Sequence, residues 1–151
     1  MDNITYKILS GPDKQSLQEA LFVIGQHIDS YWNEVKWDGQ KELRLNLDWI
    51  CKMWLQKSLY VNVVFDRNKP IGFIVVSVTQ GMLNGQLEAH SLAAYLEPSY
   101  RNQHIAERMG LMMRKYLIDK TDVDVVFWDK LISNKPFKSI TTIIFNRNGS
   151  R

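Results

Sequence analysis

The sequence predicts an α/β (α+β) fold: a mixed, mostly antiparallel sheet flanked by helices. Strand-like runs, either alternating or rich in apolar β-branched residues, recur along the whole chain. Short turns join several of these runs and favour hairpins, hence antiparallel pairing. Apolar residues at helical spacing predict amphipathic helices between them. The chain shows no internal repeat and no linker, so residues 1–151 are expected to form one domain.

The first strand and the first helix are predicted near the N-terminus. Polar and apolar residues alternate over Ile4–Leu9, as in a half-buried strand. Residues Ser10–Asp13 are turn residues that can also cap a helix. His27 lies where the following helix is expected to end, and a structural capping role is favoured there. This helix has one apolar, core-facing stripe: Leu17, Ala20, Leu21, Ile24 and Ile28.

A polar segment that contains tryptophan comes next, and then a second helix. Residues Ser30–Leu45 are mostly polar, and Asp38-Gly39 marks a turn within them. Asn46 is expected to cap a helix that runs to Lys57. Cys51 lies in this helix and is expected to be an inert core residue. The apolar face of the helix consists of Trp49, Ile50, Met53 and Trp54.

Three strands are predicted in the middle of the chain. The β-rich runs Leu59–Asp66 and Ile71–Gln80 are joined by Arg67-Asn68-Lys69-Pro70, which is typical of a hairpin turn. The segment Gly81-Met82-Leu83-Asn84-Gly85 makes a second hairpin connection into the strand Gln86–Leu96. These connections predict that the three strands lie side by side and antiparallel.

The most informative segment is the end of this last strand, together with the turn and the helix after it. Pro98 removes a backbone donor and stops the strand, and a helix is predicted to begin near Gln103 and run through Ile118. Unpaired amides at such a helix start, together with the helix dipole, form a site suited to a pyrophosphate. The helix has an apolar face made of Ile105, Met109, Met112, Met113 and Tyr116.

The C-terminal part is predicted to add two strands. Val123–Trp128 is apolar enough for a buried strand, and Ser139–Asn146 is expected to be the last one. A single helical turn is expected between them, near Asn134–Lys138.

The composition indicates an ordinary globular protein. Of its 151 residues, 45% are hydrophobic and 23% charged, the net charge is only +3, and no Lys/Arg run appears, which argues against nucleic acid as the main partner. The one cysteine rules out an intrachain disulfide. No apolar run is long enough to span a membrane, and no signal segment is evident, so a cytoplasmic location is expected. The scattered histidines predict no metal site.

The segment after the central strand resembles the signature of the GNAT acyltransferases. In that family a strand, a proline, an arginine and Gln-Gly-x-Gly/Ala bind acyl-coenzyme A. The corresponding run here is Pro98, followed by Arg101-Asn102-Gln103-His104-Ile105-Ala106. The order of predicted elements is also similar to that of the family over nearly the whole chain. The resemblance implies a GNAT-like fold and acetyl transfer from acetyl-CoA to an amine acceptor.

The resemblance also assigns residues to the acetyl-CoA site. The pantetheine arm is implied to pair with the backbone of Tyr95 and Leu96, as an added strand would. The pyrophosphate is implied to lie on the amides of Asn102, Gln103, His104, Ile105 and Ala106, with charge from Arg101 and Arg108. His104 stands where the family usually has glycine. It is either a variant phosphate clamp or a solvated residue at the start of the helix.

Glu88 is the candidate general base. It precedes Arg101 by 13 residues, a spacing that resembles that of the catalytic glutamate in the histone-acetyltransferase branch of the family. His90 is two residues further on, so the period of a strand places both side chains on one face, where they can share a proton or a water. The alternative is an ordinary polar strand edge.

Three features favour a second hypothesis, an inactive GNAT-fold binding or assembly module, and the first is His104 in place of the family's glycine. The family's acid is a tyrosine near the C-terminus, but no tyrosine follows Tyr116, and the C-terminal part is shorter than usual. The tryptophan-rich segment 30–57 (Trp32, Trp37, Trp49 and Trp54) is expected either to line the acceptor side of the cleft or to form an interface with a protein partner or a second copy.

Overall fold

The computed structural model describes residues 3–36, 40, 42–134 and 137–147. Helices and strands follow the predicted order, with a short 3₁₀ turn at Pro98–Tyr100 before the third helix. In chain order the elements are β1 (Ile4–Ser10), α1 (Lys14–Val35), α2 (Leu47–Leu55), β2 (Leu59–Asp66), β3 (Lys69–Gln80), β4 (Leu87–Leu96), α3 (Ile105–Lys120), β5 (Val125–Asn134) and β6 (Phe137–Asn146).

The strands form one mixed sheet, as predicted. Its order within the described residues is β1-β2-β3-β4-β5-β6, so each strand pairs with its neighbours in the sequence. Every pairing is antiparallel except that of β4 with β5, which are parallel. The single parallel pairing follows from α3, which carries the chain back across the sheet between these two strands.

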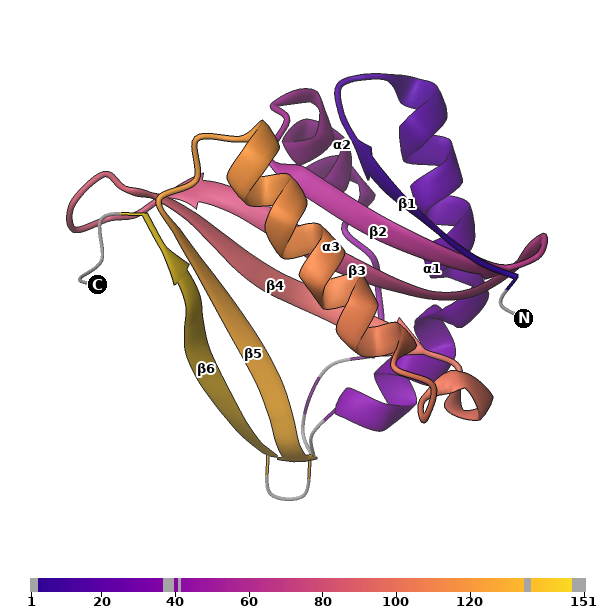
Figure 1. The fold of residues 1–151 in the computed structure, drawn as a ribbon. Helices are drawn as coiled ribbons and strands as arrows, with labels where there is room; N and C mark the ends of the chain where they lie inside the picture. Colours follow the sequence, from indigo (N-terminus) through magenta and orange to yellow (C-terminus); the bar gives the residue numbers. More distant parts are fainter. Residues whose placement is uncertain (1–2, 37–39, 41, 135–136, 148–151) are drawn as a thin grey trace.

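Helices cover both faces of the sheet (Figure 1). On one face α3 packs against the sheet, with Met109 and Met113 of the predicted stripe fully buried; Leu117, which was not predicted, is also buried, whereas Met112 and Tyr116 are only partly buried. On the other face α1 and α2 bury Ala20, Val23 and Trp54. The two cores fix the positions of α1 and α3 on either side of β4 and β5.

Helix α1 is longer than the sequence suggested. Asp13 caps it, accepting a hydrogen bond from the Ser16 amide at 2.9 Å, but the helix continues to Val35, so the first residues of the predicted polar segment are helical. Tyr31 and Val35 extend the apolar stripe and keep this last turn against the sheet. The capping role expected of His27 is therefore wrong: the residue lies inside the helix, buried and stacked on the Tyr95 ring at 5.3 Å.

Helix α2 has the expected cap and a shorter body. The Asn46 side chain accepts from the Trp49 amide at 3.0 Å. The helix ends at Leu55, because Lys57 turns into the left-handed region with φ of 57°. Trp54 is buried and donates its indole N–H to the Asp13 carbonyl at 2.9 Å, which ties α2 to the start of α1. Cys51 is exposed, contrary to the expected core position.

The helical turn expected near Asn134–Lys138 is wrong. Strand β5 runs on to Asn134 and pairs directly with β6, in a register that matches Ser133 with Lys138 and Asn134 with Phe137. A lone helical turn fixes several residues for one hydrogen bond, whereas the hairpin satisfies backbone groups along its whole length. Extending β5 brings residues after Trp128 to the wall of the site.

Candidate functional site

Strands β4 and β5 separate soon after they meet. Their pairing covers only three residue pairs, from Glu88 with Val125 to His90 with Phe127. At the next position the Ser91 hydroxyl accepts a hydrogen bond from the Asp129 amide at 3.0 Å, so a side chain spans a gap that the backbones no longer close. Beyond this point Figure 1 shows β5 and β6 diverging from β4. The backbones of β4 and β5 are thus separated in the middle of the sheet, and we call the region between them the cleft, because the cavities described below lie along it.

A bulge in β4 lies at the start of this cleft. Val76 pairs with Ser91 but Val75 pairs with Ala93, so Leu92 has no partner on β3. A bulge bends its strand and raises the local twist. It therefore supplies a local cause for the divergence of the two strands.

The open edge of β4 carries unpaired backbone groups. The Glu97 amide donates to Ile71 on β3 at 2.9 Å, so by alternation Leu96 and Ala94 turn their backbone groups away from β3 and into the cleft. The Leu96 carbonyl accepts from Arg101 Nε at 2.7 Å, as this orientation requires. Of the two residues expected to hold a pantetheine arm, Leu96 offers its backbone and Tyr95 offers its ring to the cavity wall.

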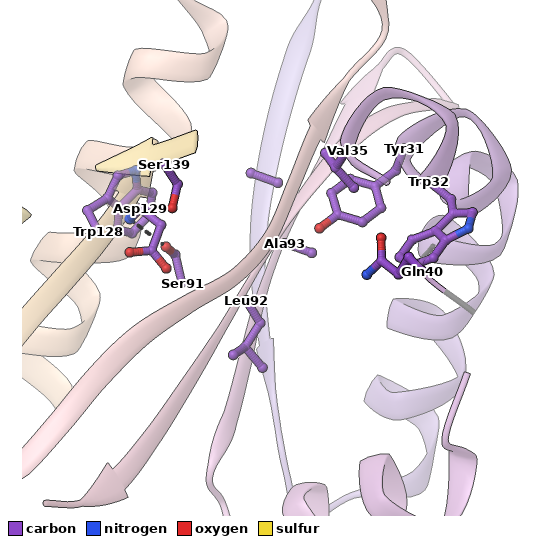
Figure 2. A pocket seen from close by; sticks show the side chains of 11 residues that line it. Tyr31, Trp32, Val35, Gln40, Ser91, Leu92, Ala93, Trp128, Asp129 and Ser139 are labelled. Atoms are coloured by element: carbon purple, nitrogen blue, oxygen red, sulfur yellow. Dashed lines mark hydrogen bonds between the residues drawn. The ribbon is translucent and has the colours of Figure 1, made fainter. Parts of the chain in front are cut away.

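A cavity of about 360 Å³ lies at the narrow end of the cleft. Figure 2 shows its two sides: Tyr31, Trp32 and Val35 of α1 face Trp128 and Asp129 of β5. The β4 residues from Ser91 to Ala94 lie between them, and Gln40 and Ser139 complete the lining. Burial raises the pKa of Tyr31, so its hydroxyl stays neutral well above physiological pH.

Two further cavities continue the first into a groove. A cavity of about 270 Å³ shares Ala94 and Trp128 with the first, and it is bounded by Glu34 of α1 on one face of the sheet and Met109 of α3 on the other. This second cavity shares Arg101 and Ala106 with a third cavity. The third cavity is also lined by Asn102, His104 and Glu107, at the start of α3. The groove thus passes through the sheet from α1 to the N-terminus of α3.

The loop before α3 contains a residue in the left-handed backbone conformation. His104 has φ of 60° and ψ of 13°, the left-handed conformation that glycine adopts most readily, although its side chain is 88% exposed. Helix α3 begins at Ile105, two residues later than predicted, and no side chain caps it. The amides of its first turn have no acceptor within the helix. Arg108 lies in this turn, and its amide donates to the His104 carbonyl at 3.1 Å.

Arg101 and His104 of this loop both face carboxylates. Arg101 donates from one Nη to both carboxylate oxygens of Glu34, at 3.0 and 2.7 Å, and its guanidinium carbon lies 5.4 Å from the centre of the Tyr95 ring. His104 Nδ1 lies 3.2 Å from Glu107 Oε2. An anion that binds here competes with Glu34 for Arg101.

Glu88 and His90 lie together at the closed end of the cleft. Their carboxylate and imidazole are 3.1 Å apart, which confirms that the two side chains share a face. The His90 ring also stacks on Phe127 with 4.8 Å between centroids. Neither side chain borders the described cavities, although His90 directly precedes Ser91, which does. Their assignment as catalytic groups stays a prediction.

Several lining residues were not predicted. Asp129 and Trp128 of β5 and Tyr31 of α1 border the 360 Å³ cavity. The available signal was weak: Asp129 is the first charged residue after an apolar run, and Tyr31 continues the stripe of the first helix. Both Asp129 and Tyr31 fell outside the boundaries predicted for their elements.

The tryptophan-rich segment divides between core and surface. Trp54 is buried, Trp49 is 42% exposed and Trp32 lines the cavity, whereas Trp37 lies outside the described residues. No group of three or more potential metal ligands occurs among the described residues. No helix in the described part of the chain is long and apolar enough to cross a membrane.

Comparison with solved structures identifies the fold. The sequence matches no protein-family model, and no curated protein matches it. Arabidopsis thaliana NAA60 in complex with a bisubstrate analogue has a TM-score of 0.62 and 14% identity, over 97% of this chain and 99% of that one. The NatC complex bound to Gag peptide and CoA has a TM-score of 0.60 and 20% identity, over 90% and 79%.

An aminoglycoside acetyltransferase from an uncultured soil metagenomic sample, in complex with sisomicin, is also similar. Its TM-score is 0.58, with 13% identity over 83% of this chain and 76% of that one. These neighbours are acetyltransferases, and the chain has the GNAT fold that the sequence signature predicted.

Proposed function

We propose that this protein is an N-acetyltransferase that moves an acetyl group directly from acetyl-CoA to an amine. The observation that carries the proposal is the groove itself, in which the open edge of β4 leads from the 360 Å³ cavity to the start of α3. Two similar structures also support the proposal: the NatC structure contains CoA and a peptide, and the NAA60 structure contains a bisubstrate analogue.

The groove suits each part of the donor substrate. A pantetheine arm carries amide groups that can pair with the backbone of Ala94 and with the Leu96 amide, as a strand added to the sheet edge; the Leu96 carbonyl already accepts from Arg101 Nε. The pyrophosphate fits the amides from Asn102 to Ala106, beside Arg101 and Arg108. The left-handed backbone at His104 retains the turn that brings these amides together.

The reaction needs little more than positioning and proton transfer. The amine nitrogen forms a bond to the acetyl carbon while the carbon–sulfur bond breaks; the amine loses a proton to a base, and the departing thiolate takes one up. Holding both substrates in line supplies most of the rate, and a general base adds about 10²–10⁴-fold. We assign the base to Glu88 with His90, which lies just beyond the narrow end of the cleft.

Calorimetric titration with acetyl-CoA tests the donor site. We expect micromolar binding that is much tighter than binding of adenosine diphosphate, because only the intact donor reaches the edge of β4. Equal affinity for acetyl-CoA and adenosine diphosphate would mean that the site binds only the phosphates. No heat and no change in melting temperature at millimolar acetyl-CoA would overturn the proposal and favour an inactive binding module.

A conservative variant tests the base. Glu88→Gln should retain acetyl-CoA binding and lower turnover at neutral pH by at least tenfold, because the amide cannot accept the amine proton. Glu19→Gln is the matched control, since Glu19 is a carboxylate of α1 that pairs with Lys7 of β1 and borders none of the three cavities of the groove. Unchanged turnover in Glu88→Gln would remove Glu88 from the mechanism.

A further inference from the structure

We infer that the acceptor is a primary amine carried on an apolar group: its ammonium form is bound by Asp129 and loses one proton to become the neutral amine that attacks the acetyl carbon. The inference rests on the proposed function and adds the chemistry of the acceptor. It derives from the lining of the 360 Å³ cavity, which combines one carboxylate, three aromatic rings and an opening into a second, wholly apolar cleft.

Asp129 is the only charged side chain among the described residues that line this cavity. Its position is fixed from two sides: its amide donates to Ser91 on β4 at 3.0 Å, and its Oδ1 accepts from the Thr141 hydroxyl at 2.5 Å. Within the described part of the chain, no lysine, arginine or histidine pairs with it. Among the described side chains, no cation therefore competes with a substrate for the second carboxylate oxygen.

The other walls favour the same kind of ligand. Tyr31 and Trp32 stand on one side of the cavity and Trp128 on the other, as Figure 2 shows. Aromatic faces attract an organic ammonium ion and contact the carbon atoms attached to it. Because burial raises the pKa of Tyr31, this wall carries no charge at neutral pH. A carboxylate on the acceptor would find no described cationic side chain in the lining.

A neighbouring cleft can take the apolar part of the acceptor. Leu92 and Ala93 line both the cavity and a cleft of about 140 Å³ between α1, α2 and the sheet. All side chains described at that cleft are apolar, and its rim includes Leu45 and Trp49, which are 37% and 42% exposed. The bulge at Leu92 thus joins a site for one positive charge to a site for hydrocarbon.

This lining argues against a polycationic, strongly hydrated acceptor. Sisomicin, which one structural neighbour binds, is such a compound. The described lining offers its several ammonium groups a single carboxylate beside mostly apolar walls, so most of them would gain no charged partner there. We therefore expect sisomicin to be a poor ligand of this cavity.

Binding of four probes to the whole chain, followed by calorimetry and tryptophan fluorescence, tests the inference without turnover. We expect 2-phenylethylamine to bind at least tenfold more tightly than 2-phenylethanol, which lacks the charge, and than ethylamine, which lacks the apolar group. Sisomicin should bind more weakly than 2-phenylethylamine. A short peptide with an N-terminal leucine and a free α-amino group is added to test whether the same chemistry is supplied by a polypeptide.

Variants identify the groups responsible. Asp129→Asn should remove the preference for 2-phenylethylamine over 2-phenylethanol. Leu92→Ala should weaken the binding of 2-phenylethylamine but leave the binding of ethylamine unchanged. Asp122→Asn, which removes an exposed carboxylate beyond the far end of α3, is the matched control and should behave as the wild type. Circular dichroism of each variant checks that it is folded.

The outcomes separate the inference from the proposed function. If acetyl-CoA binds but amine and alcohol bind equally, or Asp129→Asn retains the preference, the inference is wrong and the proposed function stands. If 2-phenylethylamine binds as expected but acetyl-CoA does not, the acceptor site is supported and transfer is excluded. If the peptide binds more tightly than 2-phenylethylamine, the inference is supported, and a polypeptide N-terminus is the molecule that supplies the amine and the apolar group.

Discussion

At the scale of single residues, His104 combines a side chain with a backbone conformation that suits glycine. Its φ is 60°. A non-glycine residue in this region costs about 1 kcal/mol or more, so the chain retains the turn at a cost in stability. The loop before α3 therefore has a backbone conformation typical of glycine, with histidine as the residue.

Replacing His104 by glycine should both stabilise the protein and open the loop. We expect His104→Gly to raise the free energy of unfolding by about 1 kcal/mol and to tighten acetyl-CoA binding, because no side chain then obstructs the approach of phosphate. Lys57→Gly is the control: it also has positive φ, at 57°, but lies at the end of α2, so it should gain stability without a change in affinity. Weaker binding in His104→Gly would show that the imidazole contacts the phosphate.

The ion pair between Arg101 and Glu34 is expected to weaken acetyl-CoA binding. Both side chains are about half exposed, at 40% and 43%, so the pair contributes little to stability but still occupies the guanidinium. Glu34→Gln should tighten acetyl-CoA binding about two- to fivefold, as expected for release from a surface ion pair of up to about 1 kcal/mol. Isothermal titration at low and high salt measures this. Glu19→Gln, which breaks the exposed pair with Lys7, should not change the affinity; a loss of affinity in Glu34→Gln would contradict the competition.

At the scale of elements, the junction of β1, α1 and α2 is packed most tightly at Gly11. A Cβ built there would lie 1.8 Å from the Trp54 carbonyl oxygen, so a side chain would force α2 away from the start of α1. Gly25, by contrast, lies on the exposed face of α1 with nothing within 4 Å of its Cβ position. The same substitution therefore has opposite consequences at the two glycines.

Urea unfolding of two alanine variants checks this contrast. Gly11→Ala should lower the free energy of unfolding by at least about 2 kcal/mol, because backbone atoms must move apart. Gly25→Ala should raise the free energy of unfolding by up to about 1 kcal/mol, since alanine is the better helix former. Equal stabilities would mean that α2 is not anchored on α1 as the Trp54–Asp13 hydrogen bond indicates.

The cap of α1 makes the stability of this helix depend on pH. Hydrogen bonds from Ser16, from its hydroxyl and its amide, lower the pKa of Asp13 below 3.8. A lowered folded-state pKa adds stability above the unfolded pKa, and this contribution is lost as the pH falls through the folded value. Asp13→Asn keeps a capping oxygen without a charge, so its melting temperature should fall less than that of the wild type between about pH 5 and pH 2. Asp13→Ala should lower the melting temperature even at neutral pH; parallel curves for the wild type and Asp13→Asn would contradict the assignment.

Element type followed from the sequence where the signals were local. Pro98 and the methionine stripe of α3 were sufficient to predict the turn from β4 into that helix. Boundaries decided by tertiary contacts were not predicted: α1 extends to Val35 because Tyr31 packs against Phe73, with ring centroids 6.2 Å apart. Strand β5 extends to Asn134 because β6 pairs with it.

At the scale of the whole molecule, the site forms where β4 and β5, which are paired over three residue pairs, separate from each other. Their divergence depends on the unpaired Leu92 on β4 and on the Ser91–Asp129 hydrogen bond, which joins residues 38 positions apart. No local pattern in either segment signals such a contact. The turn from Pro98 into α3, built from consecutive residues, was predicted, whereas Asp129 and the cavity that it lines became visible only once the strands were placed.

Hydrogen exchange with and without acetyl-CoA tests how the whole groove is used. If the donor adds to the sheet, amide exchange should slow in β4 over residues 94–96 as well as in the loop over residues 101–106, because both line one continuous groove. Strands β1 and β2, which pair on the other side of β3, are an internal control and should not change (Figure 1). Coenzyme A without the acetyl group should protect the same residues, since the arm and the phosphates are unchanged. Protection confined to the loop would mean that only the phosphates are held, and that the gap between β4 and β5 does not receive the donor.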